Sequence, residues 1–174
     1  MSSPSRLADS RGCAIDKPVM ELFIVRHAHA VDAEENPERP LSSRGREQVR
    51  QLTAFLEKSG SLNCGEVWHS PLARSRETAE LLTAGLALNA RLVEVDGLEG
   101  EADPTIIVGR LQSRREPLAI VGHEPHLSAL ASQLVAGTAE PPRFVLKKCA
   151  ALALERGDDI WRVRWHVSPE ILVG

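Results

Sequence analysis

The chain has 174 residues, of which 43% are hydrophobic and 26% charged, which suits one globular domain with a sizeable core. A formal net charge of −3 predicts no nucleic-acid partner and no binding to an anionic membrane surface. Aromatic residues make up 3% of the chain, too few for a stacking platform that would bind single-stranded nucleic acid.

The first segment, residues 1–19, is polar and has no apolar stretch of the signal-peptide type. Its composition predicts a flexible N-terminal extension, followed by one domain over residues 20–174. The three cysteines, Cys13, Cys64 and Cys149, show no CxxC spacing and are typical of a reducing compartment. We therefore expect a cytoplasmic protein without a membrane-spanning segment.

From residue 20 onward, short apolar runs alternate with amphipathic segments. Strands are predicted over residues 21–26, 65–71, 91–95 and 117–125, and helices over 42–60, 72–88, 104–115 and 126–137. An edge hairpin is predicted around residues 156–159, where alternating apolar and polar residues flank a turn. This order predicts an α/β fold of three layers, with a mainly parallel sheet covered by helices on both faces.

Polar residues follow three of the predicted strands at the point where each strand ends. They are Arg26–His27, His69–Arg74 and Gly122–His126. The carboxyl ends of parallel strands meet at one edge of a sheet, where ligands of such folds usually bind. We therefore expect these three turns to form one site.

The arginines Arg26 and Arg74 and the histidines His27 and His123 at this edge indicate a site that binds and transfers a phosphoryl group. Arg74 lies at a helix start, where a cation is unfavourable unless an anion binds there. A guanidinium group can donate two parallel hydrogen bonds to two oxygens of a phosphate. Arg26 lies beside a core strand, where a charged group without a partner is costly, and a bound phosphate would provide that partner. A neutral imidazole, His27 or His123, is a competent nucleophile toward phosphorus near pH 7.

Four stretches, "VRHAHA", "RPLSSRG", "SPLARSRET" and "VGHEPHLS", resemble in order the motifs of the histidine phosphatase superfamily, and the phosphohistidine phosphatases of the SixA type most closely. The resemblance implies a phosphoglycerate mutase-like fold. It also implies that His27 is the nucleophile, that Arg26 and Arg74 clamp phosphate oxygens, and that His123 is the second histidine of the pocket. Arg39, Leu41 and Gly45, in the second motif, are expected to be structural and to position a helix beside the pocket.

Further site residues follow from the same motifs. Ala28, His29, Ser70 and Gly122 are candidate substrate-binding residues. Ala28 replaces the glycine of the family pattern, so the loop must run in a conformation that alanine tolerates.

The general acid is sought in the acidic loop after the third strand, where the candidates are Glu99, Glu101 and Asp103. None of the three aligns with a family motif. An imidazole leaving group has a protonated pKa of roughly 6.5 and depends far less on a proton donor than an alkoxide does. Lys147 and Lys148 form either a solvated pair or a charge that steers an anionic substrate.

The resemblance implies a phosphatase that acts through a covalent phosphohistidine on His27 and needs no metal or organic cofactor. The expected substrate is phosphohistidine in a protein, with a phosphorelay component as the partner. A small-molecule phosphomonoesterase of the same superfamily and a phosphate-binding module without turnover are the alternatives. A metal-dependent hydrolase is a weaker alternative. The two histidines of "HAH" could bind a divalent cation, but the positive charge of Arg26 would lie next to it.

Overall fold

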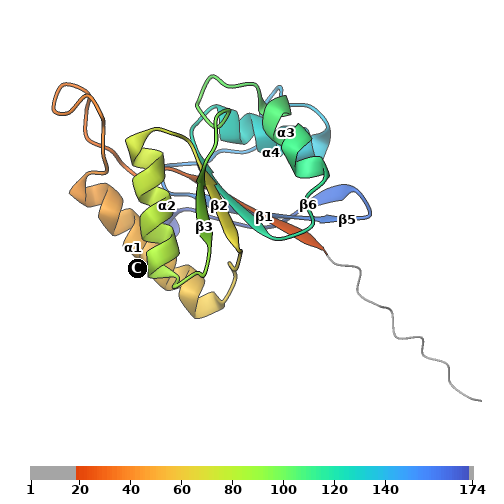
Figure 1. Cartoon of the computed structure of the whole chain (residues 1–174), viewed down its shortest axis with the longest axis horizontal. Coiled ribbons are helices and arrows are strands. Elements are labelled where there is room, and N and C mark those ends of the chain that lie inside the picture. Colours follow the sequence, from red (N-terminus) through yellow and green to blue (C-terminus); the bar gives the residue numbers. More distant parts are fainter. Residues whose placement is uncertain (1–18, 173–174) are drawn as a thin grey trace, which may run out of the picture.

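The computed structural model of the chain describes residues 19–172, so the predicted N-terminal extension and Cys13 lie outside the described residues, apart from Val19. Within residues 19–172, six strands and four α-helices follow one another in the order that Figure 1 shows. The elements are β1 Met20–Arg26, α1 Ser43–Ser59, β2 Glu66–His69, α2 Ala73–Gly85, β3 Arg91–Glu94, α3 Pro104–Gln112, β4 Leu118–Gly122, α4 His126–Ala136, β5 Ala151–Gly157 and β6 Ile160–Val167, with a short 3-10 turn at Pro169–Ile171.

The strands form one sheet in the order β3-β2-β4-β1-β5-β6. The first four strands of that order are parallel, and β5 and β6 add an antiparallel edge beside β1. The predicted mainly parallel sheet and its edge hairpin are thus confirmed. Because β4 lies between β1 and β2, the carboxyl ends of these three strands are neighbours.

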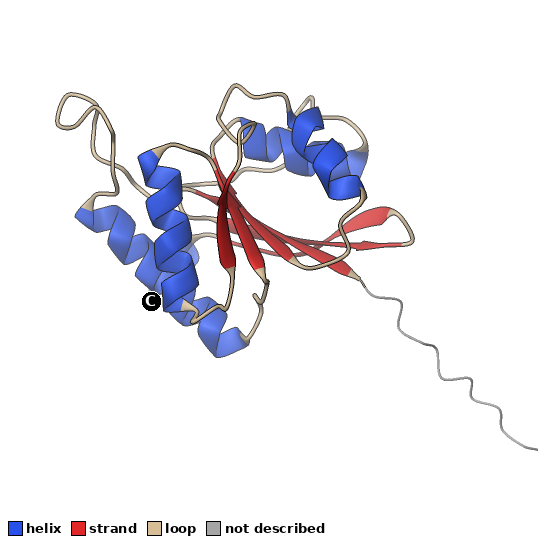
Figure 2. Cartoon of the chain, in the orientation of Figure 1, coloured by secondary structure: helices blue, strands red, loops and turns tan. Residues whose placement is uncertain are grey.

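Helices cover both faces of the sheet, as predicted (Figure 2). α1 and α2 lie together on one face, and α3 and α4 lie together on the other (Figure 1). The alternation along β1 divides the core accordingly: Phe23 and Val25 join the cluster under α1 and α2, and Leu22 and Ile24 join the cluster under α3 and α4. Strands buried on both faces explain the continuous apolar runs in the sequence.

α1 begins and ends where the sequence predicts. The Ser42 side chain accepts a hydrogen bond from the Gly45 amide, and Gly60 ends the helix with φ 60°, a conformation that glycine adopts at little cost. A Cβ atom at Gly45 would collide with the carbonyl oxygen of His29. Glycine therefore lets α1 approach the loop after β1, in the positioning role predicted for it.

Two predicted helices are shorter in the structure. α2 ends at Gly85 because the chain turns at Ala87, where φ is 49°, and α3 ends at Gln112 before the polar turn that leads to β4. Ahead of β5 the chain is irregular up to Cys149, whose φ of 60° redirects it into the strand.

Candidate active site

The three polar turns expected at one edge of the sheet do meet there. The His27 amide donates to the Gly122 carbonyl oxygen at 3.0 Å, and the Ser70 amide donates to the Val121 carbonyl oxygen at 3.2 Å. The ends of β1, β2 and β4 are thus held together by backbone hydrogen bonds. The Cys149 amide adds a bond to the His27 carbonyl oxygen at 3.2 Å, so a fourth segment fixes the same loop.

A pocket of about 340 Å³ opens at this edge. Its walls come from the ends of β1 and β4, from the first turn of α2 and from three loops. The lining residues are Arg26, His27, Arg39, Arg74, Gly100, Glu101, His123, Glu124 and Lys148. All four residues predicted to be catalytic therefore line one pocket.

The imidazole of His27 is 6% exposed, and its hydrogen bonding fixes its tautomer. Nδ1 lies 2.7 Å from the Ala28 carbonyl oxygen. A carbonyl oxygen only accepts, so Nδ1 carries the proton and Nε2 keeps its lone pair. Burial and the nearby charges of His123, Arg74 and Arg26 lower the pKa of His27 to about 3, although the bond to Ala28 opposes this. His27 is therefore a neutral nucleophile at pH 7.

His123 faces His27 across the pocket, with 4.8 Å between the ring centroids. Its Nε2 lies 2.6 Å from Oγ of Ser70, which ties the β4 turn to the β2 turn. Burial and then Arg74 lower the pKa of His123 to about 4, and Glu99 acts in the opposite direction. Ser70, a predicted substrate-binding residue, thus forms a hydrogen bond that orients His123.

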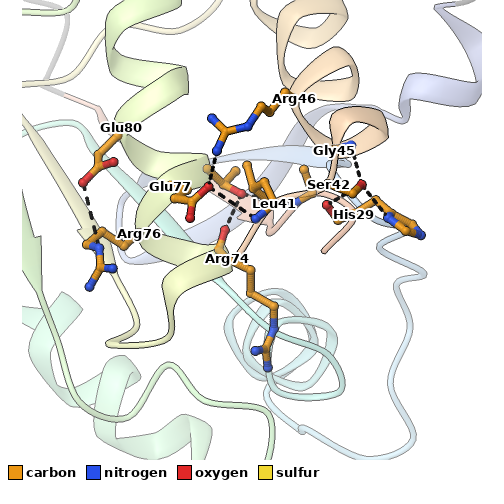
Figure 3. A network of polar contacts seen from close by, with 11 residues as sticks. His29, Leu41, Ser42, Gly45, Arg46, Arg74, Arg76, Glu77 and Glu80 are labelled. Atoms are coloured by element: carbon orange, nitrogen blue, oxygen red, sulfur yellow. Dashed lines mark hydrogen bonds and ion pairs between the residues drawn. The ribbon is translucent and has the colours of Figure 1, made fainter. Parts of the chain in front are cut away.

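The two arginines supply positive charge from two sides. Arg26 donates from Nη1 to the Leu146 carbonyl oxygen at 2.8 Å, and its buried Nε has no partner among the described residues. The Arg74 side chain extends away from α2 and from the Arg46–Glu77 ion pair in Figure 3. No hydrogen bond or ion pair joins its guanidinium to residues 19–172. Both groups keep donors for the oxygens of a bound phosphoryl group.

Ala28 occupies the position of the family glycine without backbone strain. It is fully buried, and its φ is not positive. Its amide donates to Oγ1 of Thr78 at 3.1 Å, and the same Oγ1 donates to the Arg74 carbonyl oxygen at 2.6 Å. Thr78 therefore links the loop that carries His27 to the helix turn that carries Arg74.

A family model, that of the histidine phosphatase superfamily (branch 1), matches residues 22–103. The matched range contains Arg26, His27 and Arg74, three of the four pocket residues predicted to be catalytic. Over residues 22–103 the chain is similar to the histidine phosphatase superfamily.

Individual proteins resemble this chain over most of its length. An uncharacterized protein of Picosynechococcus sp. is 28% identical over 172 residues, covering 88% of this chain and 94% of that protein. The solved structure of the protein histidine phosphatase SixA complexed with tungstate has a TM-score of 0.78 at 24% identity, with 88% of this chain and 99% of that chain covered. An alpha-ribazole phosphatase from Shigella flexneri has a TM-score of 0.71 at 18% identity, with 86% and 97% covered. The phosphoglycerate mutase-like fold is confirmed.

The acidic loop after β3 brings one of its three candidate acids to the pocket. Glu101 lines it. Asp103 instead caps α3, where its Oδ1 accepts from the Thr105 amide at 2.9 Å, and Glu99 accepts from the Gly97 amide at 2.8 Å. Asp103 and Glu99 are thus already bonded within their own loop and do not line the pocket.

Glu124 is a pocket carboxyl that sequence reasoning missed. It follows His123 in the "VGHEP" stretch and accepts a hydrogen bond from Oγ of Ser128 at 2.6 Å. Burial raises the pKa of Glu124, although Ser128 and Arg26 oppose this. Its Oε1 is buried without a partner among the described residues. A carboxyl that has a raised pKa and lines this pocket is a candidate proton donor.

The other predicted residues contribute from the rim or through the backbone. Gly122 does not line the pocket; its carbonyl oxygen anchors His27, and a Cβ there would lie 3.0 Å from the Leu98 carbonyl oxygen. His29 lies outside the pocket, with Nδ1 at 2.8 Å from Oγ of Ser42 (Figure 3). Two further residues form part of the pocket wall, Arg39 and Lys148. The sequence predicts only a structural role for Arg39, and a solvated or substrate-steering role for Lys148.

Within residues 19–172, no group of three or more His, Cys, Asp and Glu side chains is placed to hold a metal ion. The two histidines of "HAH" point to different partners, His27 to Ala28 and His29 to Ser42. None of the helices of the described region is both long enough and apolar enough to span a bilayer.

Proposed function

We propose that this protein hydrolyses phosphohistidine in proteins through a phosphohistidine intermediate on His27. The match of residues 22–103 to the histidine phosphatase superfamily supports phosphatase activity. The observation that carries the proposal is the state of His27: its Nε2 lone pair is free, its pKa is about 3, and Arg26, Arg74 and His123 surround it. This arrangement supplies a nucleophile together with positive charge for the oxygens of the transferring group.

The reaction has two displacement steps. In the first, Nε2 of His27 attacks phosphorus, the bond from phosphorus to the substrate nitrogen breaks, and that nitrogen takes up a proton from a carboxyl of the pocket. In the second, water attacks phosphorus and gives a proton to the resulting carboxylate. The bond from phosphorus to Nε2 of His27 breaks, which releases inorganic phosphate and restores the neutral imidazole. Glu124, whose pKa is raised, and Glu101 are the carboxyls that line the pocket for this transfer.

Phosphohistidine is favoured as the substrate by the chemistry of the leaving group. Imidazole, with its protonated pKa of roughly 6.5, leaves more readily than an alkoxide, so turnover tolerates a weakly placed acid. The likeness to SixA, which is described as a protein histidine phosphatase, supports the same choice. A phosphorelay component remains the expected partner. The buried free thiols of Cys64 and Cys149 fit the expected cytoplasmic location.

A small-molecule phosphomonoesterase is the second candidate. The observation that favours it is the presence of two carboxyls, Glu101 and Glu124, in the wall of the pocket, since an ester needs an acid for its leaving alkoxide. The likeness to an alpha-ribazole phosphatase agrees with this alternative.

The deciding experiment measures phosphate release, with EDTA present, from a phosphohistidine peptide and from p-nitrophenyl phosphate. Wild type is compared with His27→Ala and with His166→Ala, a histidine variant on the exposed side of β6. We expect faster release from the peptide than from the ester, lost in His27→Ala and kept in His166→Ala. Faster release from the ester would favour the phosphomonoesterase. Phosphate binding without release would indicate a binding module and refute the proposal.

A further inference from the structure

A second hollow of about 360 Å³ adjoins the catalytic pocket. Two residues, Arg26 and Lys148, line both. The full lining is Arg26, His29, Arg44, Gln48, Lys147, Lys148 and Glu170. The mechanism above makes no use of this second hollow, which lies between the start of α1 and the irregular segment before β5.

The second hollow has more positive charge than its own residues neutralise. It carries four cationic side chains and one carboxylate, Glu170, which already pairs with Lys147 at 2.8 Å. Among the described residues, no carboxylate forms an ion pair with Arg44 or Lys148. Burial, and after it Arg26, Arg39 and Arg44, lower the pKa of Lys148, as expected where cations face one another. Such a cluster attracts an anion.

The wall of the second hollow is a built structure rather than a set of loose side chains. The His29 amide donates to Oε1 of Gln48 at 2.9 Å, and His29 Nδ1 lies 2.8 Å from Oγ of Ser42 (Figure 3). Ser42 also caps α1, so Arg44 stands in the first turn of a helix whose start is fixed. The helix N-terminus adds a partial positive charge of its own.

We propose that the second hollow binds a second anionic group of the substrate, namely the carboxylate of an acidic side chain near the phosphohistidine in sequence. This inference rests on the proposed function, because the phosphoryl group must occupy the catalytic pocket. Hollows of these volumes are each about 9 Å across if treated as spheres, and an extended chain spans about 3.4 Å per residue. The acidic residue is therefore expected two or three positions from the phosphohistidine.

Two peptides test the proposal. They are identical except for Glu or Gln at the third position from the phosphohistidine, and kcat/KM is measured for each at low and high salt. We expect about tenfold higher kcat/KM for the Glu peptide at low salt, with the difference shrinking as salt screens the charges. p-Nitrophenyl phosphate, which has no second anionic group, reports the basal activity.

Arg44→Glu should abolish the preference for the Glu peptide and leave turnover of p-nitrophenyl phosphate unchanged. Lys58→Glu is the matched control: it makes the same change of charge on α1, about 20 Å farther along the helix axis. That variant should keep the preference.

The outcomes separate the two proposals. If neither peptide releases phosphate while the ester does, the proposed substrate is wrong. If both peptides are hydrolysed with equal kcat/KM by wild type, the second hollow does not bind the acidic side chain. Equal loss of preference in Arg44→Glu and Lys58→Glu would also overturn the proposal, because overall charge would then explain it.

Discussion

Acidification should destabilise this protein in part through the two histidines whose rings lie against each other in the pocket. His27 is 6% exposed and His123 is 4% exposed, and burial with nearby arginines lowers their pKa values to about 3 and about 4. In the unfolded chain both return to a pKa of about 6.5. Between these limits the unfolded state binds more protons, so the free energy of unfolding falls as pH falls from 6.5 toward 4.

The size of the effect follows from the difference in pKa. pH 5 is about 1.5 units below the histidine pKa of about 6.5 in the unfolded chain. At about 1.4 kcal/mol per unit, each histidine lowers the free energy of unfolding by about 2 kcal/mol. The loss at pH 5 relative to pH 7 is therefore about 4 kcal/mol for the pair. A typical domain has only about 5–15 kcal/mol of stability in total, so the effect is large enough to measure easily.

The assay is urea unfolding at pH 7 and pH 5 of wild type and of His27→Asn. Asparagine does not titrate, and its side-chain amide can still donate a hydrogen bond to the Ala28 carbonyl oxygen. The variant should lose about 2 kcal/mol less than wild type between the two pH values, because the other titrating groups cancel in the comparison. Equal losses in the two proteins would refute the view that His27 is held neutral by its surroundings.

Three further variants probe other parts of the site. Arg74→Ala should lower kcat about 10²–10³-fold on a phosphohistidine peptide without lowering Tm, since its guanidinium has no described protein partner; a loss under tenfold would argue against a phosphate clamp. Thr78→Val leaves the buried Ala28 amide unbonded and should cost about 1–3 kcal/mol in urea unfolding; an unchanged stability would contradict that bond. Glu124→Gln should slow hydrolysis of an alkyl phosphate far more than that of p-nitrophenyl phosphate, and should remove the fall in rate as pH rises through the raised pKa of Glu124. Equal slowing of both esters, or the same pattern in Glu101→Gln alone, would remove Glu124 from the role of proton donor.

The sequence predicts the parts of the fold that depend on local pattern. Continuous apolar runs mark strands buried on both faces, and the Ser42 and Gly60 caps mark the ends of α1, so sheet and helices could be placed from the residues alone. The site could also be located, because Arg26–His27 and Gly122–His123 follow strands whose carboxyl ends must meet.

The composition of the pocket wall depends on contacts that no local pattern encodes. Glu124 was visible beside His123, but its place in the pocket depends on the loop that packs against it, where a Cβ at Gly100 would lie 2.8 Å from the Glu124 carbonyl oxygen. Lys148 reaches the pocket from the irregular segment that precedes β5, so no strand end or helix start indicated its place there. In the acidic loop, capping of α3 by Asp103 decides which carboxyl remains available.

The crowding of Arg26, Arg39, Arg74 and Lys148 around one pocket also has a consequence for how ligands of this protein can be found. Cations that repel one another in the folded state are relieved by a bound oxyanion, and any compound that binds only the folded state raises its stability. At a hundred times its dissociation constant such a compound adds about 2.7 kcal/mol. Inorganic phosphate, the product, is one such compound, and a thermal-shift screen of phosphorylated metabolites and peptides would rank the others without any assay of turnover.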